Sequence, residues 1–260
     1  MPEPAPGPTP GPKQAERAFF LAIEGLDGAG KGTQTKALVA RAEAAGLSVA
    51  SFAFPRYGQS FFSRLITDYL NGRYGPKEAS HPLFPALLFA AERFEEAAAL
   101  RQLLAEHDLV VVDRYAASNM AYQTARLAPE AARALAADIA EIEYGVFAIP
   151  RPDLTLLLDL SPAEAQDNVL KKAARDFVEG EMDQHERDGD FLGAVRQAYL
   201  RLVEAAAESN DGALANLGPW QVIDCRAKEG DGAGGLRPVD EITAEAWVAV
   251  SAQLERRQRL

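Results

Sequence analysis

The sequence predicts an α/β fold, a five-stranded parallel sheet flanked by helices on both faces. Five short apolar, β-prone runs lie along the chain, helical patterns separate them, and the first run leads directly into a glycine-rich loop. Of the 260 residues, 48% are hydrophobic and 25% are charged, which is typical of one large globular domain. We therefore expect a single domain over residues 17–260, preceded by a disordered Pro- and Gly-rich leader at residues 1–16.

The five apolar runs are the expected strands: Phe19–Glu24, Ser48–Phe54, Leu109–Asp113, Leu154–Leu160 and Gln221–Cys225. The expected helices are Gly32–Ala45, Phe61–Asn71, Pro85–His107, Glu130–Tyr144, Pro162–Lys172, Phe191–Ser209 and Asp240–Glu255. The start of the fifth is marked by an N-cap at Ser161, a proline at the first helical position and a capping-box glutamate at Glu164.

Charge and cysteine usage exclude several classes of function. The formal net charge of −11 argues against a nucleic-acid polymer or an anionic membrane as partner, because both bind broad basic faces. No apolar stretch approaches the length of a membrane span, and the leader has no apolar core of a signal peptide. The one cysteine, Cys225, excludes an internal disulfide, and we interpret it as an inert residue at a strand end. These features predict a cytoplasmic protein.

A phosphate-binding loop follows the first strand. The segment Gly25-x-x-x-x-Gly30-Lys31 has the spacing of a P-loop, whose backbone N–H groups turn towards a phosphate while the lysine adds a cation. The expected nucleotide-binding residues are Gly25, Leu26, Asp27, Gly28, Ala29, Gly30, Lys31, Gly32 and Thr33. One position departs from the pattern: Gly32 stands where Ser or Thr usually binds Mg²⁺, so Thr33, one place later, is our candidate for that role.

A second centre follows the third strand, which ends in Asp113-Arg114. A carboxylate at the carboxyl end of a strand beside the P-loop strand would approach Mg²⁺, directly or through water. Arg114 would offer paired donors to a phosphate. In a protein without a P-loop we would interpret the pair as a strand-capping Asp and a surface Arg.

Four segments together resemble thymidylate kinases, in a lid-type bacterial form of the P-loop nucleoside monophosphate kinases. They are EGLDGAGKGTQ, FPRYGQ at Phe54–Gln59, DRYAASNMAYQ at Asp113–Gln123 and KKAARD at Lys171–Asp176. The resemblance runs from about residue 18 to the final helix. It implies in-line transfer of the γ-phosphoryl group of ATP, bound with Mg²⁺, to dTMP, by a homodimer with a mobile lid. The apolar stretch Pro82–Leu104 is a candidate for the dimer surface.

The resemblance assigns roles to the matched residues. Lys31 and the loop backbone would bind the donor phosphates, with Mg²⁺ near Thr33 and Asp113. Arg56 and Arg114 would surround the dTMP phosphate. Asp27 would meet the 3′-hydroxyl of dTMP and water around Mg²⁺, although a carboxylate in a phosphate loop is also explained as a stabilising turn residue.

The base pocket is inferred from the same resemblance. Phe89 would stack on thymine and Arg93, four residues later on the same helix face, would donate to a base carbonyl. Neighbouring Phe84 and Phe94 leave the register open by one turn. Asn119 would contact the base, and Tyr122 would crowd the sugar 2′ position. The substrate-binding set is completed by Phe54, Tyr57, Ser118 and Gln123.

The variable positions of the phosphate loop, from Leu26 to Ala29, contain no cation. The resemblance implies that a catalytic cation lies either in this loop or in a mobile lid, so we expect it to come from the lid, about residues 171–188, with Arg175 as the best candidate among Lys171, Lys172, Arg175 and Arg187. Alternatively, these cations belong to a solvated helix end.

Two other functions stay open at this point. GKGTQ also resembles adenylate kinases, so another monophosphate kinase is the nearest rival. A catalytically silent nucleotide-binding regulator is the alternative from a different class.

Overall fold

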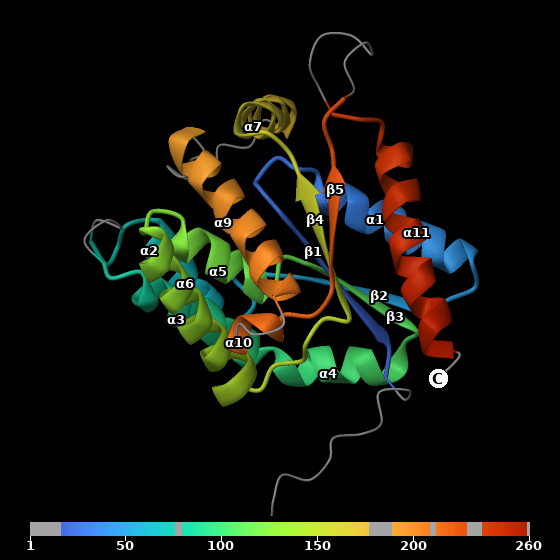
Figure 1. Ribbon diagram of the computed structural model, residues 1–260, viewed down its shortest axis with the longest axis horizontal. Coiled ribbons are helices and arrows are strands. Elements are labelled where there is room, and N and C mark those ends of the chain that lie inside the picture. Colours follow the sequence, from blue (N-terminus) through green and yellow to red (C-terminus); the bar gives the residue numbers. More distant parts are fainter. Residues whose placement is uncertain (1–16, 76–79, 177–188, 209–211, 228–235, 259–260) are drawn as a thin grey trace, which may run out of the picture.

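The computed structural model describes residues 17–75, 80–176, 189–208, 212–227 and 236–258. Its centre is one sheet of five parallel strands in the order β2-β3-β1-β4-β5 (Figure 1). The strands are β1 (Phe19–Gly25), β2 (Val49–Ala53), β3 (Leu109–Asp113), β4 (Leu154–Asp159) and β5 (Trp220–Asp224). All five correspond to predicted strands, so the predicted fold class is confirmed.

The helices cover both faces of this sheet. In Figure 1, α1 and α11 lie on one side of the sheet, and α5, α6 and α9 lie on the other. The helices have these bounds: α1 Lys31–Ala44, α2 Phe61–Leu70, α3 Leu83–Glu95, α4 Ala97–Glu106, α5 Ala116–Thr124, α6 Pro129–Ala140, the π-helix η3 Glu141–Val146, α7 Pro162–Asp176, α9 Gly189–Ala207, α10 Gly212–Ala215 and α11 Val239–Gln258. Among the described helices, none has the length and apolar character needed to cross a membrane.

The three inner strands bring the important segments together. β1 and β4 are buried along their whole length, and β3 is buried up to Val112, which explains their nearly continuous apolar sequences. Ile23 of β1 is paired with Asp113 of β3, and Gly25 of β1 with Leu158 of β4. The phosphate loop therefore starts between the carboxyl ends of β3 and β4, where parallel sheets bind ligands.

Three helical predictions differ from the structure. The single helix expected over Pro85–His107 is two helices, which meet at Glu96 because α3 packs against α2 and α5 whereas α4 packs against β3. The helix expected over Glu130–Tyr144 changes at Glu141 into the π-helix η3. Helix α5 was not predicted, since its sequence, AASNMAYQT, lacks a clear apolar period.

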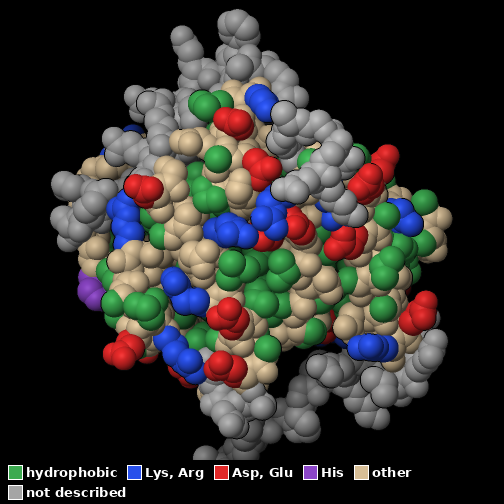
Figure 2. Space-filling view, turned by 45° about the horizontal axis from the view of Figure 1, so that its top comes forward, with side chains coloured by type: hydrophobic (Ala, Val, Ile, Leu, Met, Phe, Trp, Pro, Cys, Tyr) green, Lys and Arg blue, Asp and Glu red, His purple; other side chains and the backbone are tan. Residues whose placement is uncertain are grey.

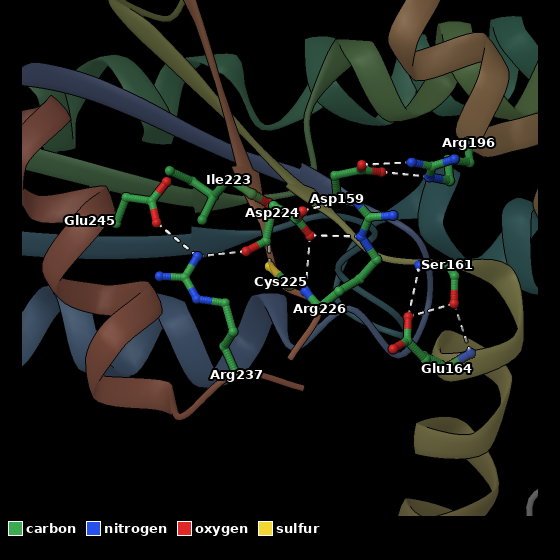
Figure 3. A network of polar contacts seen from close by, with 10 residues as sticks. All are labelled: Asp159, Ser161, Glu164, Arg196, Ile223, Asp224, Cys225, Arg226, Arg237 and Glu245. Atoms are coloured by element: carbon green, nitrogen blue, oxygen red, sulfur yellow. Dashed lines mark hydrogen bonds and ion pairs between the residues drawn. The ribbon is translucent and has the colours of Figure 1, made fainter. Parts of the chain in front are cut away.

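Two local predictions can be followed at the strand ends. The Ser161 capping box is confirmed: the Glu164 N–H donates to Ser161 Oγ at 3.3 Å, and the Ser161 N–H donates to Glu164 Oε2 at 3.3 Å (Figure 3). Cys225 is a free, buried thiol just beyond β5, and burial raises its pKa to about 12. The leader at residues 1–16 and residues 177–188 of the expected lid lie outside the described residues.

Candidate active site

The phosphate loop joins β1 to α1 and is fitted closely against α7. A Cβ atom on Gly28, whose φ is +86°, would lie 2.0 Å from the carbonyl oxygen of Ala165 in α7. A Cβ atom on Gly25 would lie 2.7 Å from the carbonyl oxygen of Leu158. Asn168 of α7 donates from Nδ2 to the Gly28 carbonyl oxygen at 3.0 Å. The loop therefore requires glycine at both positions, for space as well as for backbone conformation.

Lys31 is buried and its side chain folds back onto the loop. Its Nζ donates to the carbonyl oxygens of Gly25, at 3.1 Å, and Leu26, at 2.8 Å. Burial, and then the positive charge of Arg114, lowers the pKa of Lys31 to about 8. The structure thus places the predicted phosphate-binding ammonium inside the loop that it is expected to serve.

Asp27, Arg114 and Tyr122 form one polar cluster beside the loop. Arg114 Nη2 forms an ion pair with Asp27 Oδ1, and the Tyr122 hydroxyl donates to Asp27 Oδ2 at 2.9 Å. Burial raises the pKa of Asp27, but the charges of Arg114 and Lys31 outweigh it and bring the pKa to about 2. Asp27 is therefore ionised at neutral pH. Three residues predicted from two separate motifs are therefore together in space.

The backbone of Arg114 is unusual. Its φ of 64° lies in the left-handed region, which is strained for a residue with a side chain. Its N–H donates to the Ile23 carbonyl oxygen of β1 at 3.0 Å, so the turn after β3 is fastened to the strand that carries the phosphate loop. Strained residues of this kind gather at functional sites, and here the conformation directs the guanidinium towards Asp27.

Glu24 is a site residue that the sequence reasoning missed. Its buried carboxylate accepts hydrogen bonds from the N–H groups of Tyr115, at 2.8 Å, and Ser118, at 3.2 Å, and from the Tyr199 hydroxyl at 3.0 Å. Burial raises its pKa. The carboxylate therefore joins β1 to α5 and α9 directly behind Arg114. A charged residue within an apolar strand was the available signal.

Asp113 lies at the carboxyl end of β3, beside the start of α1. Its Oδ2 is 3.5 Å from the position that a Cβ atom would take on Gly32, and its Oδ1 is buried with no hydrogen-bond partner among the described residues. An unpaired buried carboxylate oxygen suits Mg²⁺ or a water bound to it. Thr33 lies exposed in the first turn of α1. The space beside Gly32 is ordinary, so glycine is not sterically required there.

The described residues contain no cluster of three metal-ligating side chains.

The FPR segment forms the turn after β2. The Arg56 N–H donates to Glu92 Oε1, and the Arg56 guanidinium donates to Gln59 Oε1 from Nε at 3.2 Å and lies 3.5 Å from the Glu96 carboxylate. Glu92 is buried, which raises its pKa to about 7, and its Oε2 has no hydrogen-bond partner in the described chain. Sequence reasoning did not identify Glu92. It fixes the backbone of the residue expected to meet the dTMP phosphate.

The remaining predicted residues of this segment differ in exposure. Phe54 is buried and its ring centroid is 6.0 Å from that of Tyr115, so it packs within the core. Tyr57 is 56% exposed at the turn.

The expected base pocket lies between α3, α5 and η3. Arg93 and Asn119 are both buried, and both bind Glu143 of η3. Phe89, one turn before Arg93, is half-buried and packs with Leu88 beside α2. Gln123 is half-buried near the end of α5. The structure therefore joins Arg93 to Asn119 through a carboxylate that the sequence did not indicate, because Glu143 is 50 residues away from Arg93 and lies in an unpredicted π-helix.

Two ion pairs lie at the carboxyl ends of β4 and β5, and we call these four residues the β4–β5 edge (Figure 3). Arg196 of α9 binds Asp159 through two contacts, at 2.6 and 2.7 Å. Arg226 binds Asp224 through two contacts, at 2.8 and 2.7 Å. Figure 2, in which the top of Figure 1 comes forward, shows Lys and Arg side chains lying among acidic ones on this face.

The expected lid cations are described only in part. Lys171 lies exposed on α7, and the backbone of that helix continues to Asp176, so Arg175 belongs to its last turn. The side chains of Lys172 and Arg175, and all of Arg187, lie outside the described part. Arg175 therefore stays a prediction.

Known proteins with similar sequences are thymidylate kinases. The family model described as thymidylate kinase matches residues 23–211. The thymidylate kinase of Mycobacterium tuberculosis is 37% identical over 222 residues, covering 85% of this chain and 99% of that protein. The thymidylate kinase of Bifidobacterium longum is 34% identical and covers 81% and 98%. A solved thymidylate kinase from Candida albicans, 24% identical with a TM-score of 0.61 over 91% of this chain and 92% of its own, has the same fold.

Proposed function

Because this chain belongs to the thymidylate kinase family, we propose that it transfers the γ-phosphoryl group of ATP to dTMP, giving ADP and dTDP. The observation that carries this assignment is the cluster of Asp27, Arg114 and Tyr122 against the phosphate loop. In this proposal the cluster forms the acceptor site directly beside the donor site, as direct transfer between two nucleotides requires.

Catalysis of this reaction consists mainly of positioning and of neutralising charge. Lys31 and the N–H groups of the loop bind the donor phosphates. Arg114 and Arg56 bind the acceptor phosphate and hold it in line with the γ-phosphate. Thr33 and Asp113 would hold Mg²⁺, which when bound neutralises charge on the phosphate oxygens.

Asp27 and Tyr122 position the acceptor sugar. Because Asp27 is ionised, its carboxylate accepts a hydrogen bond from the 3′-hydroxyl of dTMP. The Tyr122 hydroxyl, bound to Asp27 Oδ2, holds that carboxylate in place and would crowd a 2′-hydroxyl on the acceptor sugar. This arrangement favours deoxyribose.

The lid supplies the last cation. A Cβ atom cannot be accommodated at Gly28, and the other variable loop positions are uncharged or acidic, so the loop provides no further positive charge. We assign that role to Arg175 at the end of α7.

The purified protein with Mg²⁺ and ATP tests this proposal. We expect dTMP to be phosphorylated far faster than AMP, CMP or thymidine. Preference for AMP or for thymidine would contradict the assignment, and no turnover with any acceptor would indicate a nucleotide-binding regulator.

Phe89→Ala should raise the KM for dTMP with a small change in kcat, because stacking contributes mainly to binding. An unchanged KM would place the stacking residue elsewhere.

We further propose that the enzyme is a cytoplasmic homodimer that associates through α3 and η3. Leu87, Phe94 and Val146 are 40%, 54% and 70% exposed there, and the Phe94 ring lies 5.0 Å from that of Phe147. Exposed apolar side chains gathered on one face are typical of an interface. Sedimentation should give a dimer for the wild type and a monomer for Phe94→Glu.

The proposed cytoplasmic location is supported by the free thiol of Cys225, which suits a reducing compartment, and cell fractionation tests it.

A further inference from the structure

The most completely buried polar network at the expected base pocket is centred on Glu143. Its carboxylate is 0% exposed and binds Arg93 Nε at 2.9 Å and Asn119 Nδ2 at 2.9 Å. These three residues come from η3, α3 and α5. The Glu143 backbone is also fastened, because its carbonyl oxygen accepts a hydrogen bond from the Ile149 N–H at 3.0 Å. The network is therefore held from both ends of the glutamate.

The surroundings of Asn119 fix the direction of its amide. Nδ2 lies 2.9 Å from the Ala86 carbonyl oxygen and 2.9 Å from Glu143 Oε1, and both of these groups are acceptors. Only the NH₂ end of the amide can face two acceptors, so the chemistry of the neighbours sets the orientation. Oδ1 is then the end that remains, and it is buried with no hydrogen-bond partner among the described residues. A buried acceptor without a donor is costly unless a ligand supplies one.

Glu143 also sets the direction of Arg93. It binds the guanidinium through Nε and Nη2, which leaves Nη1 outside this contact. A guanidinium is planar, so fixing two of its nitrogens fixes the third. Besides Oδ1, the unpaired buried acceptor of Asn119, the expected pocket thus has a cation whose Nη1 lies outside the contact with Glu143.

We propose that Glu143 is a positioning residue that makes the acceptor site select a pyrimidine-2,4-dione over a 4-aminopyrimidine. Resting on the proposed dTMP kinase function, this inference gives N3–H of thymine to Asn119 Oδ1 and O4 to Arg93. Cytosine presents an acceptor at N3 and an amino donor at C4, so it opposes both groups. The glutamate touches neither the base nor the phosphates. It acts by holding Asn119 and Arg93 in the one orientation that fits the dione.

The test compares dTMP with dCMP, because general damage to the fold lowers activity on both substrates alike. In Glu143→Gln the negative charge is lost and one of the two acceptor oxygens becomes an NH₂ donor that opposes the N–H groups of its partners, so Arg93 and Asn119 are no longer held in one orientation. We expect the ratio of kcat/KM for dTMP to that for dCMP to fall at least tenfold, or about 1.4 kcal/mol in discrimination, mainly through a higher KM for dTMP. Glu143→Asp, which keeps the charge on a shorter side chain, should give an intermediate ratio.

Glu141→Gln is the matched control, since Glu141 belongs to the same π-helix and is exposed. Its ratio should equal that of the wild type. Either folded Glu143 variant with an unchanged ratio would overturn the inference. If neither variant folds, a crystal structure of the wild type with dTMP decides: Asn119 Oδ1 must face N3, and an amide turned the other way contradicts the proposal. Failure of the wild type to phosphorylate dTMP would instead refute the proposed function.

Discussion

The base pocket and the β4–β5 edge are both built from arginine–carboxylate pairs, but they differ in exposure. At the pocket, Arg93 and Glu143 are 3% and 0% exposed, and Asn119 completes their hydrogen bonds. At the edge, Arg196 and Asp159 are 24% and 10% exposed, and Arg226 and Asp224 are 49% and 53% exposed. Buried ion pairs lose much when one partner is removed, whereas exposed pairs contribute little to stability.

This difference sets the cost of rearranging each region. At the pocket, buried hydrogen bonds hold Arg93, Asn119 and Glu143 in place, which suits the proposed recognition of the base by fixed donors and acceptors. At the edge, water already solvates the exposed pair of Arg226 and Asp224, so this ion pair can be broken at small cost. We therefore expect the pocket to keep its side-chain arrangement when a ligand binds, and the Arg226–Asp224 pair to rearrange easily.

The largest effects should come from neither region but from the cations at the phosphate loop, where the proposed transfer takes place. Lys31→Ala and Arg114→Ala should each lower kcat about 10³-fold, because each removes a cation aimed at charge that develops during transfer. Single-turnover measurements with Mg²⁺, ATP and dTMP would show this. Circular dichroism must show native structure in both variants. A loss confined to KM would mean that these cations serve only binding.

Arg93→Met against Arg226→Met tests the comparison directly. Arg93→Met leaves Glu143 buried without its charge partner, and we expect a loss of about 3–5 kcal/mol in the free energy of unfolding. Arg226→Met should cost about 0–1 kcal/mol. Urea denaturation of both variants measures the difference. Equal losses in the free energy of unfolding would show that burial does not make the Arg93–Glu143 pair more important for stability than the Arg226–Asp224 pair.

Glu92, a second buried carboxylate beside Arg93 in α3, provides a pH-dependent test of stability. Burial raises its pKa from 4.5 to about 7, so the folded chain binds a proton more tightly than the unfolded chain. Its stabilising effect is full below about pH 4.5 and is lost as the pH rises to about 7. Relative to Glu92→Gln, the wild type should lose up to about 1.4 kcal/mol per pH unit across that window. Denaturation at pH 4.5, 6 and 7.5 measures this, and parallel curves would contradict it.

A small effect is expected next to the β4–β5 edge, at the start of α7. Ser161→Ala removes the capping-box hydroxyl and should cost about 1 kcal/mol in the free energy of unfolding. Its effect on kcat should be small, because the cap supports the helix without contacting either phosphate. Thermal denaturation checks the first value. A large loss of turnover would show that the helix start takes part in the reaction.

The sequence was sufficient to predict the strands of the sheet and the position of the phosphate loop. Apolar runs such as Leu109–Asp113 are strands because both of their faces are buried, and glycine spacing reveals a loop whose geometry depends on local residues. The members of the cluster Asp27, Arg114 and Tyr122 could be predicted because they belong to recognisable motifs.

The carboxylates that hold the site residues in place could not be predicted from the sequence. Glu92 and Glu143 act through contacts with residues 36 and 50 positions away, and no local pattern reports such a partner. The π-helix that carries Glu143 follows an ordinary helical pattern in the sequence. The break at Glu96 likewise arises from packing on different neighbours, since no Pro or Gly marks it.

The contact between Gly28 and Ala165 limits which substitutions the phosphate loop can accept without a change in α7. With 2.0 Å to the Ala165 carbonyl oxygen, even a methyl group at position 28 would displace the first turns of α7. A single substitution therefore cannot introduce an arginine at this position of the loop, and the loop and α7 would have to change together. On the mechanism proposed above, this contact keeps a catalytic cation out of position 28, which is why we assign that cation to the lid.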